Sequence, residues 1–348
     1  MSRICLYFRR EPERDRWLPG DRLVRPLVRR IARGKARPGG IDKVFINLCL
    51  GLDRLAVRYE VNLPFEELRD DDQVGVIGVG RYALQGYDRP NPIVAGIALM
   101  THPSEWPSLC QDYPVVTYLQ HCAWSNDVYK RFFGDRCRIW PVGIDTQSWQ
   151  PADPGEKRFD FLIYDKIHWQ RGELVPGLLD VIRSELARRK LTFLELRYGR
   201  YDEGQYKDAL RKCRAMIFLC EHESQGIAYQ ECLASGVPVL AWDQGRYLDP
   251  NRFAWGEPDI PATSVPYFDE RCGLRFRDVH QFSDTLTQFI ALERSGAFAP
   301  QSYVMQNLTL EKCSGQFLDI LNQAQTSTAA TANERSGEKS IKRAGSLG

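Results

Sequence analysis

The chain lacks the features that mark membrane-spanning, disulfide-stapled and metal-binding proteins. No run approaches the roughly 20 uninterrupted apolar residues of a membrane span. No C-x-x-C pair occurs, and neither an H-x-x-x-H pattern nor a cluster of Asp and Glu indicates a metal site. Cysteines such as Cys49, Cys220 and Cys232 lie in apolar runs, so we expect reduced, buried thiols. Because the first residues show no signal-peptide pattern, we expect a cytoplasmic protein.

One segment is strongly basic, although the net charge of the whole chain is only +2. Residues 9–37 contain eleven Lys or Arg against four acidic residues, a local charge of +7 (eleven minus four). Residues 21–37 place apolar side chains on one helical face, flanked by arginines. Such a helix either lies on an anionic membrane surface, which would make the protein peripheral to the membrane, or packs on its own domain. Interleaved aromatic residues are missing, so we expect no nucleic-acid partner.

Short apolar runs alternate with helical patterns along the chain, which is typical of an α/β fold with parallel sheets. The alternation stops in a Pro-rich stretch at 138–151 and then begins again. We therefore predict two Rossmann-like, doubly wound domains facing a central cleft. The predicted parts are a first domain at 1–142, a second at 143–306, a helix at 307–322 that could cross back to the first domain, and a disordered tail at 323–348.

The stretch 220–245 carries the most chemistry. Glu223 and Glu231 flank a glycine between two short apolar runs, and a helix is predicted to begin near Gly226. Ligands of open parallel sheets bind beyond the carboxyl ends of the strands. A helix N-terminus there offers free N–H groups to an anion, and a glycine permits close approach of a ligand to the backbone. Two carboxylates beside such an anion site suit a ligand with hydroxyl groups at both ends and phosphate between them, which is the layout of a nucleotide-sugar.

This stretch resembles the signature of retaining GT-B glycosyltransferases of the large family 4 (group 1) class. The signature is E-x(7)-E around a glycine loop, a helix rich in small residues, and G-x-P-V before a strand. Residues in matching places are Glu223, Gly226, Glu231, Ala234, Gly236, Pro238 and Val239. Residues 38–52 and 141–149 resemble the first glycine loop with its helix and the interdomain segment of that family.

The resemblance implies roles for individual residues. Glu231 is expected to bind the ribose hydroxyls, and Glu223 is expected near the donor sugar. The backbone from Gln225 through Gly226 to Ile227 would hold sugar hydroxyls or phosphate. Lys166 and Arg171 would neutralise the diphosphate, and Arg197 and Arg200 would contact the base. Catalysis would then rest on stabilising the departing diphosphate, without a covalent nucleophile, a metal or a cofactor.

Four further residues are candidates from their places in the pattern. His102 and His121 each follow a predicted strand of the first domain and would face the cleft, although a structural histidine is the ordinary alternative. The glycine loop at Gly39 and Gly40 is expected to line the acceptor side. His222 follows no pattern that assigns it a role.

A dinucleotide-binding fingerprint is a competing interpretation, because G-x-G-x-x-A occurs at residues 78–83. It follows an internal strand, and no acidic residue stands at the end of the next strand, which disfavours an oxidoreductase. The sequence therefore predicts transfer of a sugar from a UDP- or GDP-sugar to a hydroxyl of a glycan, lipid-linked or small-molecule acceptor. The alternatives are a non-catalytic GT-B-like protein that binds nucleotides or glycans, and a nucleotide-sugar 2-epimerase.

Overall fold

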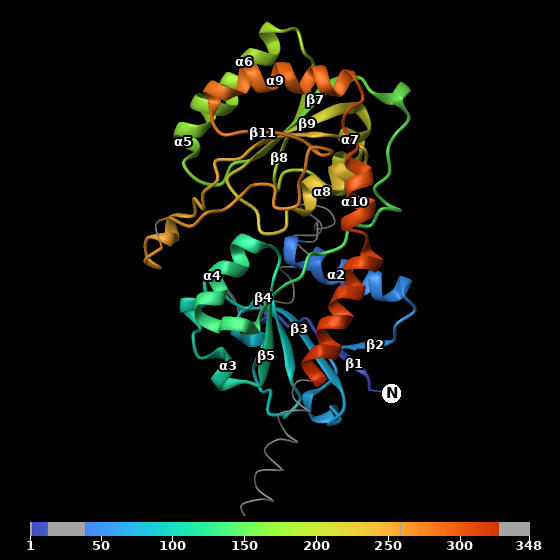
Figure 1. Ribbon diagram of the computed structural model, residues 1–348, viewed down its shortest axis with the longest axis vertical. Coiled ribbons are helices and arrows are strands. Elements are labelled where there is room, and N and C mark those ends of the chain that lie inside the picture. Colours follow the sequence, from blue (N-terminus) through green and yellow to red (C-terminus); the bar gives the residue numbers. More distant parts are fainter. Residues whose placement is uncertain (1, 13–38, 258, 327–348) are drawn as a thin grey trace, which may run out of the picture.

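The computed structural model describes residues 2–12, 39–257 and 259–326. Two α/β domains lie one above the other, each built around its own sheet (Figure 1). The predicted basic helix at 21–37 and most of the predicted tail, residues 327–348, lie outside the described residues.

The first domain contains a six-stranded sheet in the order β2-β1-β3-β4-β5-β6, and every paired strand in it is parallel. Its strands are β1 (Ile4–Tyr7), β2 (Tyr59–Val61), β3 (Gln73–Val79), β4 (Ile93–Ala98), β5 (Val115–Gln120) and β6 (Cys137–Ile139). Its α-helices are α2 (Gly40–Arg54), α3 (Leu109–Asp112) and α4 (Ala123–Phe133). Its short 3-10 turns are η1 (Phe65–Glu67), η2 (Arg81–Leu84), η3 (Pro103–Glu105) and η4 (Gly134–Arg136).

The second domain contains a five-stranded parallel sheet in the order β11-β10-β9-β7-β8. Its strands are β7 (Phe159–Lys166), β8 (Phe193–Arg197), β9 (Cys213–Cys220), β10 (Val239–Trp242) and β11 (Gly273–Phe276). Its helices are α5 (Arg171–Leu174), α6 (Asp180–Arg188), α7 (Glu203–Lys212), α8 (Ile227–Ala234), α9 (Val279–Arg294) and α10 (Pro300–Asn307). Shorter turns are the 3-10 turns η5 (Pro154–Glu156) and η7 (Pro250–Arg252) and the π-helical turn η6 (Val175–Leu179), which leads into α6.

Each sheet is covered on both faces, which explains the continuous apolar runs in the sequence. In β7, Phe161 and Ile163 point into one hydrophobic cluster, whereas Leu162 and Tyr164 point into the cluster on the opposite face. The first sheet likewise separates two clusters. The predicted pair of doubly wound domains is therefore confirmed.

The C-terminal segment returns to the first domain. Ile144, in the connection after β6, forms a parallel bridge with Thr309. A helix over residues 310–326 then packs on the first sheet, beside α2 in Figure 1, with Phe317 in the first domain's core. The indole of Trp140 donates a hydrogen bond to the carbonyl of Cys313 (2.9 Å). This helix extends to residue 326, beyond the predicted end at 322.

The crossing between the two domains leaves no room for a side chain at Gly143. A Cβ atom there would lie 2.5 Å from the Cα atom of Leu310 and 2.8 Å from the carbonyl oxygen of Thr309. Overpacking of this kind costs about 1–3 kcal/mol. We expect Gly143→Ala to lower the melting temperature by about 2–10 °C, measured by differential scanning calorimetry.

Gly172→Ala is the matched control, because a Cβ atom at Gly172 would meet no other described atom within 4 Å. If the Gly143→Ala protein has the same melting temperature as the parent, the C-terminal segment at Thr309 and Leu310 can shift to accommodate the added methyl group, and the expected clash is absent.

Candidate active site

A cleft of about 1000 Å³ lies between the two domains. Its walls come from the residues that follow β3, β4 and β5 in the first sheet and β7, β8 and β9 in the second. The carboxyl ends of both sheets therefore face the same space, where open parallel sheets bind ligands. The cleft brings together residues far apart in the sequence, from Gly39 to Ile260.

Lys166 and Glu223 form an ion pair on the second-domain wall of this cleft. Lys166 ends β7 and is in register with Cys220, the last residue of β9, so the loop after β9 brings Glu223 beside it. The Lys166 ammonium group also lies 4.6 Å from the ring centroid of Tyr198. Burial by itself would lower the pKa of Lys166, but the adjacent Glu223 carboxylate raises it overall. Lys166 is thus a charged lysine held at the cleft.

The start of α8 borders the same cleft. Gly226 precedes the helix with a left-handed φ of +79°, and a Cβ atom there would lie 2.0 Å from the Tyr229 ring. Among the described residues, no side chain caps the helix. Gly226 and Ile227 line the cleft, so the N-terminal end of α8 offers amide groups and a positive dipole end beside Lys166 and Glu223.

Glu231 lies one turn further into α8 and is buried, with 2% of its surface exposed. Lys43 of α2, in the first domain, forms an ion pair with it. The Lys43 ammonium group also lies 3.3 Å from Glu203 and 5.3 Å from the ring centroid of Trp149. Lys43 lines the cleft, whereas its partner Glu231 is not among the lining residues. A cation of the first domain therefore covers the carboxylate predicted to bind ribose.

Gln225 holds α8 against the interdomain connection. Its side-chain oxygen accepts a hydrogen bond from the Val142 amide (2.9 Å), and its side-chain nitrogen donates to the Val142 carbonyl (3.2 Å). The same nitrogen donates to Gln230 (2.7 Å). The side chain is thus structural here, while the residue also lines the cleft.

The three predicted arginines are not brought to the cleft wall. Arg171 forms a bidentate pair with Asp165 (2.8 and 2.7 Å) and also donates to the carbonyl of Ile167 (2.8 Å). The hydrogen bonds that Arg171 donates to the Asp165 carboxylate raise the pKa of Arg171. Arg197 and Arg200 are solvent-exposed outside the cleft lining. Of the predicted basic pair, Lys166 alone faces the cleft.

The first-domain candidates do line the cleft. His102 is buried, stacks on Trp255 with ring centroids 4.7 Å apart, and places its Nε2 atom 3.0 Å from Glu257 of the second domain. His121 is also buried, and burial lowers its pKa to about 4. Gly39 and Gly40 lie at the start of α2, on the same side. Both histidines already have interdomain or core contacts.

Sequence reasoning missed an aromatic group around the loop after β9. His222 stacks on Trp169 (5.2 Å between ring centroids) and lies 4.1 Å from Tyr247. Trp124 of the first domain packs against both His222 and Tyr247 and donates to the carbonyl of Glu223 (2.9 Å). Burial lowers the pKa of His222 to about 3. Its position two residues after the end of β9 was the signal that could have identified it.

Within the described ranges, no group of three or more His, Cys, Asp or Glu side chains is placed to hold a metal ion. The helices of these same ranges include none that is long and apolar enough to cross a membrane.

Similar folds occur among solved structures. No protein-family model and no curated protein sequence matches the chain. AviGT4, a glycosyltransferase involved in avilamycin A biosynthesis, is 14% identical, with 94% of this chain and 99% of that chain covered and a TM-score of 0.56. Sucrose-phosphate synthase from Thermosynechococcus elongatus is 10% identical, with 94% and 100% covered and a TM-score of 0.56.

A TarM variant from S. aureus, solved in complex with fondaparinux, alpha-GlcNAc-glycerol and UDP, is 11% identical with a TM-score of 0.54. The alignment covers 81% of this chain and 58% of TarM. Together with the two parallel sheets, these similarities show that the chain has the GT-B fold, as the sequence predicts.

The Lys43–Glu231 pair gives a prediction about stability. Removing one member of a buried ion pair costs about 3–5 kcal/mol, because the other charge stays desolvated. We expect Lys43→Ala to lower the melting temperature clearly and Lys43→Ala/Glu231→Gln to recover part of the loss, measured by thermal denaturation.

Lys207→Ala is the matched control. Lys207 also lies over Trp149 (4.7 Å to the ring centroid) but pairs with the exposed carboxylate of Glu203 (3.0 Å), and exposed i,i+4 pairs contribute only about 0.3–0.5 kcal/mol. Equal melting of the Lys43→Ala and Lys207→Ala proteins would contradict a buried, stabilising pair.

Burial of His121 predicts a loss of stability in acid. Its pKa of about 4 in the folded chain lies below the ordinary value of 6.5, so the unfolded chain binds more protons between these values. The contribution of His121 to the free energy of unfolding is therefore complete above pH 6.5. It falls as the pH drops toward 4, by up to about 1.4 kcal/mol per pH unit. We expect the melting temperature of His121→Gln to fall less steeply over this range than that of the parent. Parallel curves would refute this assignment, and His280→Gln, at an exposed site, serves as the control.

Proposed function

We propose that the chain is a glycosyltransferase that moves a sugar from a nucleoside diphosphate donor to an acceptor hydroxyl. The observation that carries the proposal is the position of Lys166, charged and paired with Glu223, beside the amide groups that open α8. A cation and a helix N-terminus on one wall of a cleft suit a diphosphate. The neighbouring carboxylate suits the hydroxyl groups of a sugar.

Catalysis would rest on stabilising the charge of the departing diphosphate. Lys166 and the α8 amides are fixed before the ligand arrives, which is the condition for electrostatic preorganisation. Glu223 holds Lys166 in place and would exchange part of this contact for sugar hydroxyls. We further propose retention of configuration and a reaction without a metal, on the resemblance of the E-x(7)-E stretch to the family 4 class.

The donor would be a UDP- or GDP-sugar that acts as a co-substrate, with no other cofactor. UDP is present in the TarM complex, which supports a uridine donor here. The ribose would bind Glu231 in place of the Lys43 ammonium group. Because Lys43 belongs to the first domain and Glu231 to the second, this exchange would link donor binding to the contact between the domains.

A GT-B-like protein that binds without turnover is the second candidate. It is favoured by the Arg171–Asp165 pair, which keeps one of the two predicted diphosphate-binding cations away from the cleft. Turnover distinguishes the two candidates: an inactive protein would bind UDP or GDP but would neither transfer nor hydrolyse any UDP- or GDP-sugar in a panel.

The two carboxylates should have separable effects. Glu231→Gln should weaken binding of UDP or GDP about ten- to a hundredfold, since a hydrogen bond to a charged group contributes about 1.5–3 kcal/mol. Glu223→Ala should spare binding of the free nucleotide and mainly lower transfer. Lys166→Ala should reduce both. Calorimetric titration with UDP and GDP, beside transfer rates, measures these effects.

Lys212→Ala controls for the loss of a lysine, because Lys212 pairs with Asp208 on the surface. Circular dichroism checks that each variant is folded. Parent-like nucleotide binding by Glu231→Gln would remove the ribose assignment. If, in addition, the Glu223→Ala protein transfers sugar at the parent's rate, neither Glu223 nor Glu231 takes part in donor binding or transfer.

A further inference from the structure

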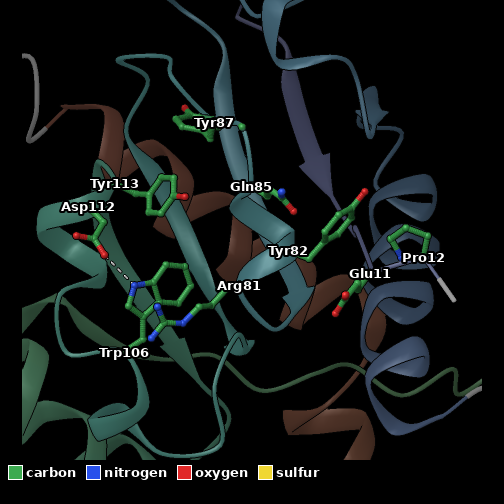
Figure 2. A pocket seen from close by; sticks show the side chains of 10 residues that line it. Glu11, Pro12, Arg81, Tyr82, Gln85, Tyr87, Trp106, Asp112 and Tyr113 are labelled. Carbon is green, nitrogen blue, oxygen red and sulfur yellow. Dashed lines mark hydrogen bonds between the residues drawn. The ribbon is translucent and has the colours of Figure 1, made fainter. Parts of the chain in front are cut away.

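A second hollow, of about 810 Å³, lies on the first domain. Figure 2 shows its lining: Tyr82 and Tyr113 stand on opposite sides, with Gln85 and Arg81 between them. Trp106 and Asp112 lie at the end beside Arg81 (Figure 2). This hollow, called the aromatic groove below, has the size of a ligand site.

The polar groups of the aromatic groove are held in place by its aromatic residues. The Arg81 guanidinium lies 4.8 Å from the ring centroid of Trp106. The Trp106 indole donates to Asp112 (2.9 Å), and its ring meets Tyr113 edge-on at 5.8 Å. The hydrogen bonds from Trp106 and Ser108 lower the pKa of Asp112, which keeps it an ionised acceptor. The groove thus presents donors and an acceptor in fixed positions.

The aromatic groove begins where the interdomain cleft ends. Gly80 lines the cleft, and the next residue, Arg81, lines the groove. Likewise, Glu105 lines the cleft and the next residue, Trp106, lines the groove. Arg81 donates to the carbonyl of Glu105 (2.6 Å), which ties these two dividing points together. The two spaces therefore adjoin at the start of η2 and the end of η3, where neighbouring residues line one space or the other.

We propose that the aromatic groove binds the distal sugar units of an oligosaccharide acceptor whose reacting end lies in the cleft. Tyrosine faces carry negative partial charge and match the C–H faces of a pyranose ring. The Arg81 donors, the Gln85 amide and the Asp112 carboxylate match hydroxyl groups, which both donate and accept. The lining is mainly aromatic and polar, and Pro12 is the one aliphatic side chain among its described residues, which favours a glycan over an apolar peptide segment.

The acceptor assignment rests on the proposed function, but binding in the groove requires no turnover. The test is a printed glycan array probed with the full chain, comparing the parent with Tyr82→Ala/Tyr113→Ala. We expect the parent to bind oligosaccharides of at least about three units, and the double variant to bind them about tenfold more weakly or not at all. Tyr82→Phe/Tyr113→Phe keeps both rings and should retain binding.

Phe253→Ala is the matched control, since Phe253 is the most exposed of the large hydrophobic residues described and lies outside both linings. The proposal is overturned if no glycan binds or if the double alanine variant binds like the parent. Calorimetric titration of the same variant with UDP separates this failure from failure of the proposed function. The proposed nucleotide contacts lie on the second domain, so UDP binding should be unchanged.

Discussion

The contact between Lys43 and Glu231 is the constraint on which the arrangement of the cleft depends. Two buried side chains of opposite charge, one from each domain, offset the cost of each other's desolvation only while they stay together. The pair joins the start of α2 to α8, so the glycine loop of the first domain lies opposite the helix N-terminus of the second. The hydrogen bonds between Gln225 and Val142 support the same junction.

The two domains contribute different kinds of groups to the walls of the cleft. The second domain contributes the Lys166–Glu223 pair and the amides of α8. The first domain contributes buried histidines, the glycine loop and, next to the cleft, the aromatic groove. This division suits a reaction in which one domain binds a charged donor and the other recognises an uncharged, hydroxyl-rich acceptor.

The sequence predicted the parts of the molecule that local patterns encode. The apolar run of β7 and the helical period of α2 indicated two parallel sheets, and the glycine at 226 located the start of α8. Strands β2 and β6 have only three residues each, too few for a period to be recognised.

The sequence could not predict which charged side chains pair with one another. Lys43 and Glu231 are 188 positions apart, so no local pattern joins them. Arg171 fitted the spacing of a diphosphate ligand, but Asp165, six residues earlier at the end of β7, binds its guanidinium.

The measurement that tests the account most directly is a crystal structure with UDP bound. The account predicts the diphosphate within hydrogen-bond distance of Lys166 and the first amides of α8, with the ribose on Glu231 in place of Lys43. A diphosphate bound elsewhere, or UDP bound with the Lys43–Glu231 pair intact, would contradict it.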